Sequence, residues 1–175
     1  SHTINNGKGV IEFETEPTII PYRAFCGNYD LKSITIPAGV TSIGSEAFRD
    51  CSELESITIP EGVVSIGTEA FYRCSKLLSV NIPIGVTSIA DELFAFCSNL
   101  KSVNIPETVT AIGKSVFSNC SALESISLPS SAKSWDLRTL LRDCKSLKEF
   151  KGPLATEDGR SLVADGVLYK VASAG

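Results

Sequence analysis

Cysteine has the most conspicuous spacing of any residue type in this 175-residue sequence, and a regular set of thiols could bind a metal ion or form disulfides. Five of the six cysteines recur in an almost constant phase, with one extra position before the last: Cys51, Cys74, Cys97, Cys120 and Cys144. The Cys-x-x-Cys pair that is typical of zinc and redox sites is absent. A metal or disulfide ladder and a column of buried thiols both remain open, and we favour the buried thiols. Cys26 lies outside this phase, and we expect it to be the accessible thiol.

Histidine, the most common acid–base residue of active sites, occurs once, at His2. This excludes serine–histidine and cysteine–histidine nucleophiles and the His-Glu-x-x-His zinc motif. The adjacent acids Asp91–Glu92 and Glu157–Asp158 could act as acid–base pairs, but neighbouring acids on a turn are usually a solvated surface. No phosphate-binding glycine loop is present. We therefore expect no enzymatic activity, no metal and no cofactor.

The overall charge argues against several classes of partner. The 16 Lys and Arg residues against 20 Asp and Glu give a net charge of −4, which provides no basic surface for nucleic acid or anionic lipid. No apolar run approaches the roughly 20 residues that cross a bilayer, so we expect no direct membrane insertion. The sequence contains no methionine, which indicates a processed product or a fragment from which any targeting segment has been removed.

Most of the sequence consists of an internal repeat with a period of 23 residues, the spacing from Leu31 to Leu54. The clear copies are LKSITIPAGVTSIGSEAFRDCSE from Leu31, LESITIPEGVVSIGTEAFYRCSK from Leu54, LLSVNIPIGVTSIADELFAFCSN from Leu77 and LKSVNIPETVTAIGKSVFSNCSA from Leu100. A copy one residue longer begins at Leu123, and another begins at Leu147 and soon departs from the pattern. Counting back one period from the first clear copy predicts a degenerate leading copy. Its apolar residues Ile11, Phe13, Ile20 and Phe25 fall in the columns of Ile34, Ile36, Ile43 and Phe48.

Each copy predicts one coil with short strands and a short helical turn. The apolar residues at its fourth and sixth positions, with polar residues between them, are typical of a strand that ends at the following proline. Residues 40–43 are expected to form a second short strand or a turn, which Gly44 breaks. Ser45 is a candidate N-cap for a helical turn over residues 46–50.

One coil cannot bury its apolar edge alone, so successive coils must stack with equivalent side chains in columns about 4.8 Å apart. The predicted fold class is an α/β repeat: a right-handed solenoid with 23-residue repeats, short parallel strands and short helical turns. Its interior is expected to contain an aligned column of Phe48, Phe71, Phe94 and Phe117. Trp135 falls in the column of Ile43, and we interpret it as a gap-filling core residue.

The pattern L-x-S-I-x-I-P-x-x-V-x-x-I-G-x-x-A-F-x-x-C-S-x, which residues 54–76 match at nearly every defined position, resembles the BspA-like (Treponema pallidum type) leucine-rich repeat. The resemblance covers about residues 8–150, and residues 149–175 look like an inter-repeat segment of Bacteroides surface proteins of this family. It implies a leucine-rich repeat solenoid in a secreted or cell-surface bacterial protein that attaches to host or neighbouring-cell proteins. The family has no common catalytic residues, so the resemblance implies none here.

We divide the chain into three segments. Residues 1–30 are expected to form a degenerate N-terminal capping repeat, residues 31–147 the leucine-rich repeat solenoid, and residues 148–175 a C-terminal cap or inter-repeat hairpin. The hairpin is predicted from Asp165-Gly166, which stands between two apolar runs.

Two outward-facing surfaces are candidate binding sites. The first, the strand face, consists of small uncharged residues in two columns: Ser33, Ser56, Ser79, Ser102 and Ser125, and beside them Thr35, Thr58, Asn81, Asn104 and Ser127. This strip suits an extended partner, although small residues are also what a crowded parallel sheet accommodates. The second follows the helical turns and consists of Arg49, Tyr72, Arg73, Phe96 and Arg142, residue types that are enriched in protein interfaces. For Phe96, packing under a neighbouring coil is an equal alternative.

From these features we predict a non-enzymatic protein-interaction or adhesion module of a bacterial cell-surface or secreted protein. A rigid strand face would present many weak contacts to a host or neighbouring-cell protein or glycan at little ordering cost. The alternative is a structural spacer segment of a longer surface protein with binding elsewhere. The two hypotheses differ in whether the isolated chain binds a partner at all.

Overall fold

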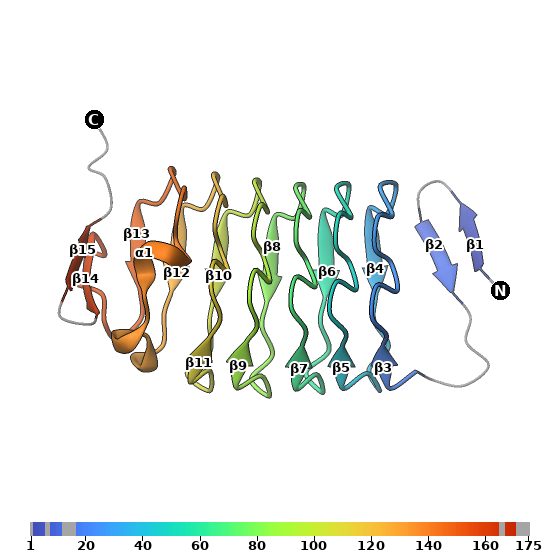
Figure 1. Ribbon diagram of the computed structural model, residues 1–175, viewed down its shortest axis with the longest axis horizontal. Coiled ribbons are helices and arrows are strands. Elements are labelled where there is room, and N and C mark those ends of the chain that lie inside the picture. Colours follow the sequence, from blue (N-terminus) through green and yellow to red (C-terminus); the bar gives the residue numbers. More distant parts are fainter. Residues whose placement is uncertain (1, 6–7, 12–16, 165–166, 171–175) are drawn as a thin grey trace.

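The computed structural model describes residues 2–5, 8–11, 17–164 and 167–170, and its central part is a stack of flat coils (Figure 1). We number them coil 1 (17–30), coil 2 (31–53), coil 3 (54–76), coil 4 (77–99), coil 5 (100–122) and coil 6 (123–146). Strand residues one repeat apart lie side by side and pair in parallel, as Ser33 does with Ser56. The fold class predicted from the sequence, a solenoid of short parallel strands, is therefore confirmed.

The longer strands form one parallel six-stranded sheet along the stack. In chain order they are β4 (Ser33–Thr35), β6 (Ser56–Thr58), β8 (Ser79–Asn81), β10 (Ser102–Asn104), β12 (Ser125–Ser127) and β13 (Glu149–Lys151). The middle residue of a strand, such as Ile57 or Val103, faces the core, and the residues beside it face outward. This alternation follows from the strand geometry, in which successive side chains point to opposite faces.

The shorter strands form a second row on another side of the coils. They are β3 (Ile19–Ile20), β5 (Ser42–Ile43) and β7 (Ser65–Ile66), which make a three-stranded parallel sheet, and β9 (Ser88–Ile89) and β11 (Ala111–Ile112), which make a separate pair. Residues 40–43 are expected from the sequence to form a short strand or a turn, and the last two of them form the strand β5.

The boundary between coils 3 and 4 differs from the others, and we call it the open junction. Strands β7 and β9 do not pair there. Strands β6 and β8 pair only through Ser56 and Ser79, whereas β4 pairs with β6 at three positions. The amides of Thr87 and Ala90 make no hydrogen bond to coil 3 in this part of the chain, which is described throughout. Both rows of strands are therefore weakened at one place along the stack.

The segment after each short strand is not the helical turn that the sequence predicted. In residues 46–50 the chain makes tight turns, with positive φ angles of 55° at Glu46 and 59° at Asp50. Alternate amides bond within the coil, and the amides between them bond to the next coil, as Phe48 N–H does to the Ala70 carbonyl (2.8 Å). A helix directs its amides along its own axis and could not supply these bonds between coils. We call this segment and its equivalents in the other coils the turn edge.

A column of stacked phenylalanine rings runs through the interior. Neighbouring ring centroids of Phe25, Phe48, Phe71, Phe94 and Phe117 lie 5.0, 5.4, 5.5 and 5.8 Å apart, with the planes nearly parallel. The rings of coils 2–5 are fully buried. The predicted alignment of these residues is confirmed, and each such ring contributes about 2–3 kcal/mol through burial.

Coil 1 follows the repeat in its second half. Ile20 pairs with Ile43 and Phe25 stacks on Phe48, as predicted for a degenerate leading copy. The column assignment of Ile11 is wrong, because Ile11 lies in β2 (Lys8–Ile11), which pairs antiparallel with β1 (His2–Asn5) and is not part of the six-stranded sheet. Phe13 lies outside the described residues.

Coil 6 is one residue longer and contains helical structure. The 3-10 helix η1 (Ser130–Ser134) and the α-helix α1 (Leu137–Leu140) take the places of the short strand and the turn edge. The Asp136 side chain caps α1 by accepting two backbone N–H bonds. Trp135, between the two helices, is buried in the core, as we interpreted it from the sequence.

The chain after coil 6 adds β13 to the sheet and continues into β14 (Ser161–Ala164), which pairs antiparallel with β15 (Val167–Lys170). Leu162 of β14 is fully buried against the core. The predicted Asp165-Gly166 turn lies outside the described residues. The division of the chain into a leading cap, a solenoid and a closing segment remains a prediction.

Candidate functional site

The strand face presents both predicted columns of small polar residues in register. Ser79 aligns with Ser56 on one side and Ser102 on the other, and Asn81 aligns with Asn104. The polar residues of β6, β8 and β10 are exposed, while Ser33, Ser125 and Ser127 nearer the ends of the sheet are half-buried. The structure therefore brings the predicted strand-face residues together on one surface, with its most exposed part in the middle.

The column beside the strand face carries charges of both signs. Its residues are Lys32, Glu55, Leu78, Lys101 and Glu124, and all are exposed. Lys148 of the next turn continues this column and lies 3.5 Å from Glu124 through its Nζ atom. A partner lying on the strand face would thus contact an uncharged strip, beside which runs a column that contains both positively and negatively charged residues.

The predicted turn-edge residues Arg49, Tyr72, Arg73 and Phe96 form a compact group, which we call the aromatic–arginine cluster. The Arg49 guanidinium lies over the Tyr72 ring, 4.6 Å from its centroid. The Arg73 guanidinium lies 5.3 Å from the Tyr72 centroid and 5.5 Å from that of Phe96, and the two rings meet edge to face. Phe96 is 36% exposed, so it packs at the surface and not beneath a neighbouring coil.

Arg142, also expected on this edge, lies apart from the cluster. Its Nε donates to the Ser118 hydroxyl at 3.3 Å. Arg142 and Tyr72 occupy the same column of the repeat, but the small residues Ala95 and Ser118 stand between them. The gap of two coils is too wide for direct contact.

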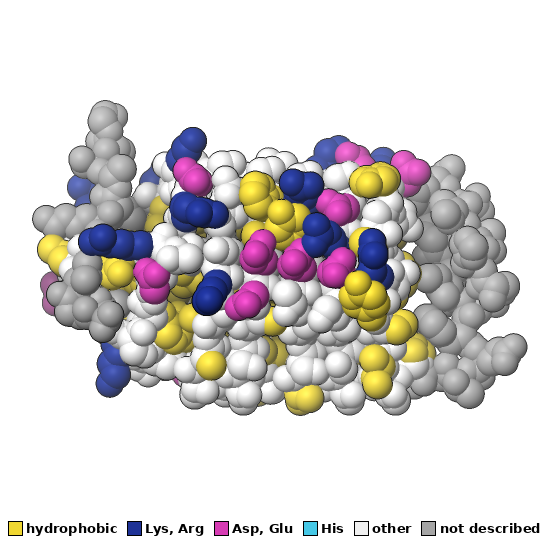
Figure 2. Space-filling view, in the orientation of Figure 1, with side chains coloured by type: hydrophobic (Ala, Val, Ile, Leu, Met, Phe, Trp, Pro, Cys, Tyr) yellow, Lys and Arg dark blue, Asp and Glu magenta, His cyan; other side chains and the backbone are white. Residues whose placement is uncertain are grey.

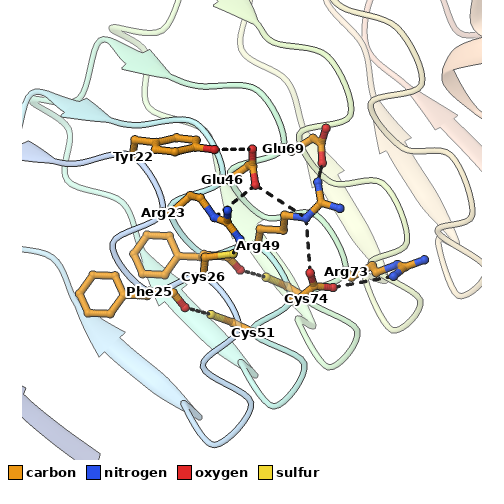
Figure 3. A network of polar contacts seen from close by, with 12 residues as sticks. Tyr22, Arg23, Phe25, Cys26, Glu46, Arg49, Cys51, Glu69, Arg73 and Cys74 are labelled. Carbon is orange, nitrogen blue, oxygen red and sulfur yellow. Dashed lines mark hydrogen bonds and ion pairs between the residues drawn. The ribbon is translucent and has the colours of Figure 1, made fainter.

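Ion pairs link the two arginines of the aromatic–arginine cluster to acids of coils 2 and 3, and Figure 3 shows this polar network around Arg49. Glu46 accepts a hydrogen bond from the Tyr22 hydroxyl (3.2 Å), and its Oε2 atom lies 3.6 Å from Arg23 Nε. Arg49 forms an ion pair with Glu69 of the next coil. Sequence reasoning missed this network, although acids and arginines in facing turn-edge columns gave a signal. Such partly exposed pairs contribute about 0–1 kcal/mol each, but they fix side-chain positions.

The five cysteines of the column are free thiols, and the buried-thiol interpretation is confirmed for Cys51, Cys74, Cys97 and Cys120, whereas Cys144 is half-buried. Each donates to the phenylalanine carbonyl of the preceding coil, as Cys74 Sγ does to Phe48 and Cys97 Sγ to Phe71, both at 3.2 Å. Burial raises the pKa of Cys51 to about 12 and that of Cys97 well above its ordinary value. Because the thiolate is the reactive form, these thiols are chemically inert in the folded chain.

Cys26, the thiol outside this column, is half-buried and receives a hydrogen bond from Arg23 Nη2 at 3.4 Å. Cys144, at the other end of the stack, is also half-buried. Burial still raises the pKa of Cys144 to about 12.

The two acidic pairs singled out as possible acid–base groups stabilise turns. Asp91 Oδ1 accepts the Lys114 amide of the next coil at 2.7 Å. Asp158 accepts the Thr156 hydroxyl (2.6 Å) and the Arg160 amide (3.0 Å), and these bonds lower the pKa of its carboxyl. Within the described residues, no group of three or more His, Cys, Asp or Glu side chains could hold a metal ion. None of the helices in the described ranges is long and apolar enough to cross a bilayer.

Comparison with protein families matches residues 18–151 to six copies of the BspA type leucine rich repeat region. Proteins of this family are typically interaction modules of surface proteins, and the fold and family are typically non-enzymatic. No curated protein matches the chain.

Several solved structures are similar to this chain. The leucine-rich repeat protein of T. pallidum is 28% identical, with a TM-score of 0.72 over 85% of this chain and 72% of that one. A leucine-rich repeat protein from Bacteroides ovatus is 26% identical, with a TM-score of 0.60 over 90% of this chain and 55% of that one. A leucine-rich cell surface protein of Faecalibacterium prausnitzii is 28% identical, with a TM-score of 0.60 over 98% of this chain and 50% of that one. With six repeat copies matched over most of its length, the chain belongs to the BspA-type leucine-rich repeat family.

Proposed function

We propose that this chain is a non-enzymatic protein-interaction module of a bacterial cell-surface or secreted protein, and that the strand face is its binding surface. The observation that carries this proposal is the register of the six-stranded sheet, which repeats the same hydroxyl and amide groups at a fixed spacing. An extracellular location is supported by the similarity to the F. prausnitzii protein, which is a leucine-rich cell surface protein.

The mechanism of binding is rigid display. The polar side chains of the strand face are short and stand on a sheet that the stacked phenylalanines hold in place. Short side chains lose little rotamer entropy on binding, so many individually weak hydrogen bonds can add up to a stable complex. An extended segment of a host or neighbouring-cell protein, lying across the strands, would meet equivalent groups in each coil.

Titration of purified extracellular proteins and glycans against the isolated chain tests this proposal. Ser79→Arg and Asn81→Arg place a long charged side chain in the middle of the strand face and should weaken a saturable interaction at least about tenfold. Thr87→Arg is the matched control, because Thr87 is exposed in the same coil but lies outside the strand face. An interaction that survives both strand-face substitutions would place binding elsewhere. Failure of every tested partner to bind would favour the spacer hypothesis.

A further inference from the structure

Phe96 breaks the pattern of its column at the turn edge. The equivalent residues in the other coils are all polar or glycine: Gly27, Asp50, Arg73, Asn119 and Asp143. The position requires a positive φ angle, which is 62° at Phe96. Glycine, Asn and Asp adopt this conformation readily, whereas a bulky aromatic residue adopts it at a cost. Folding alone would favour Asn here, so the aromatic side chain calls for another explanation.

Other outward positions near the open junction also carry apolar residues in place of polar ones. In coils 2–6 the exposed large hydrophobic residues are Val64, Leu78, Ile84 and Phe96, all in coils 3 and 4, and coil 1 at the end of the stack carries three more, Ile19, Tyr22 and Tyr29. The column of Val64 contains threonine in coils 1, 2, 4 and 5 and Lys133 in coil 6. Figure 2 shows hydrophobic side chains gathered with charges of both signs on one face of the stack. Of the exposed residues of coils 3 and 4, Phe96 contacts Tyr72 on the turn edge and adds apolar surface to the aromatic–arginine cluster.

Arg73 supplies the polar part of this surface. Its guanidinium lies against both the Tyr72 and the Phe96 rings, which contact each other edge to face, and its side chain is still 55% exposed. Its one ion pair, with Asp50 Oδ1, is long at 4.0 Å. Arg49, in contrast, is occupied by Glu69. Arg73 therefore retains N–H donors for a ligand, and a guanidinium held in one plane suits a carboxylate, which it can bind through two parallel hydrogen bonds.

We propose that the aromatic–arginine cluster is a docking surface for a protein segment that presents one carboxylate to Arg73 and an apolar side chain to Phe96 and Tyr72. The inference rests on the proposed function, since it assumes that the chain binds proteins, but it assigns a second surface with its own chemistry. Glu92, next in the column after Glu69, has no ion pair among the described residues. Its charge disfavours long acidic runs and selects segments with an isolated carboxylate.

A library of random peptides displayed on phage and selected on the immobilised chain is the test. Enriched peptides should carry an Asp or Glu beside an apolar residue, and their binding is then measured by fluorescence polarisation. Arg73→Gln and Phe96→Asn should each weaken binding about tenfold or more. Ile84→Asn is the matched control, because it removes an exposed apolar side chain of coil 4 that is not part of the cluster.

Phe96→Asn also separates docking from a structural role. Asn fits the backbone conformation of this position, so the variant should unfold at the same or a higher urea concentration while it loses the peptide. A marked loss of stability would show that Phe96 clamps coils 3 and 4 together and would overturn the proposal. Peptides without a carboxylate, or binding that Arg73→Gln leaves intact, would also overturn it.

The failure of this inference is distinguishable from that of the proposed function. Peptides that bind the chain and respond to Ser79→Arg, but not to Arg73→Gln, would leave the strand face as the binding surface and exclude the cluster. A chain that enriches no peptide and binds no extracellular protein would contradict both.

Discussion

The boundary between coils 2 and 3 and the open junction between coils 3 and 4 join nearly identical sequences in different ways. At the first boundary both rows of strands pair fully, through three residues of β4 and β6 and two residues of β5 and β7. At the open junction one residue pair remains. The turn edge is hydrogen-bonded at both, since Phe48 N–H bonds to Ala70 and Phe71 N–H to Leu93. The two sides of a coil can therefore separate independently.

A single β-carbon accounts for much of the difference. Gly44, Gly67 and Gly113 follow the short strands, and a Cβ at Gly67 would lie 2.4 Å from the backbone nitrogen of Ser45. Ala90 occupies this position in coil 4 and carries such a Cβ. Coil 4 must therefore stand further from coil 3 on this side. Close backbone approach, and not turn formation, is what requires glycine here.

The largest expected effect tests whether the open junction reaches the core. Phe71 and Phe94 stack across it at 5.5 Å, much as Phe48 and Phe71 do at 5.4 Å. Phe48→Ala and Phe71→Ala should therefore cost about the same, roughly 4 kcal/mol in the free energy of unfolding. Urea denaturation measures both. A Phe71→Ala cost less than half that of Phe48→Ala would mean that the core is divided at the junction.

The second-largest effect is expected from a substitution that separates the fully paired strands at the boundary between coils 2 and 3. Gly67→Ala introduces the Cβ that coil 4 already carries, and it should separate β5 from β7 at a cost of about 2 kcal/mol. Urea denaturation gives the loss of stability, and hydrogen exchange at Val64 and Gly67 should become faster. Gly62→Ala is the control, because a Cβ there would meet only atoms at 3.5 Å and beyond. Equal effects of the two substitutions would refute the Cβ explanation.

The free energy of unfolding at alkaline pH allows a comparison of Cys74 and Cys97, the thiols on the two sides of the open junction. Burial raises the pKa of both Cys74 and Cys97, so the folded chain keeps these protons while the unfolded chain loses them above about pH 8.5. Their contribution to stability is complete below that pH and is lost as the pH rises. At pH 10 each thiol should cost about 2 kcal/mol relative to pH 7, and Cys74→Ser and Cys97→Ser should each abolish that part. A smaller pH effect for Cys97 would indicate that water enters at the junction.

The smallest effect is the repair of the open junction. Ala90→Gly removes the obstructing Cβ and should let the amides at positions 87 and 90 bond to coil 3. The two new hydrogen bonds stabilise by about 1 kcal/mol each, and the flexibility of glycine offsets up to about half of this, so the net gain is about 1 kcal/mol. Amide hydrogen exchange should slow at Thr87 in the variant. Unchanged exchange there would point to another cause, such as Leu93, which replaces the alanine of coils 2 and 3.

Much of the fold could be predicted from the sequence, because equivalent residues of successive repeats must contact one another in a stack of coils. The alignment of successive copies predicts that Phe48 lies on Phe71 and Ser56 beside Ser79, as the structure has them. The turn edge could not be predicted in this way. Its Glu, Ala, Phe and Arg residues suit a helix in isolation, and only the hydrogen bonds to the next coil favour the two positive φ angles.

The two candidate sites also differ in how far the sequence predicts them. The strand face follows directly from strand periodicity, so its residues could be named from the sequence. The aromatic–arginine cluster could be named as a set of residue types, but the position of Arg73 against two rings depends on side-chain directions set by the turn edge. The separation of Arg142 from that set depends on the small residues between them.

The hydrogen bonds of the turn edge give this side of the stack an electrical polarity. The bond from Phe25 N–H to Ala47 is continued from Phe48 to Ala70 and from Phe71 to Leu93, so that linked peptide groups form one row along the stack. Every dipole in this row has its amide hydrogen directed toward the later coil, which places partial positive charge toward coil 6 and partial negative charge toward coil 1. An α-helix has the reverse polarity relative to its chain direction. On this side of the stack, anions are therefore favoured at the carboxyl-terminal end.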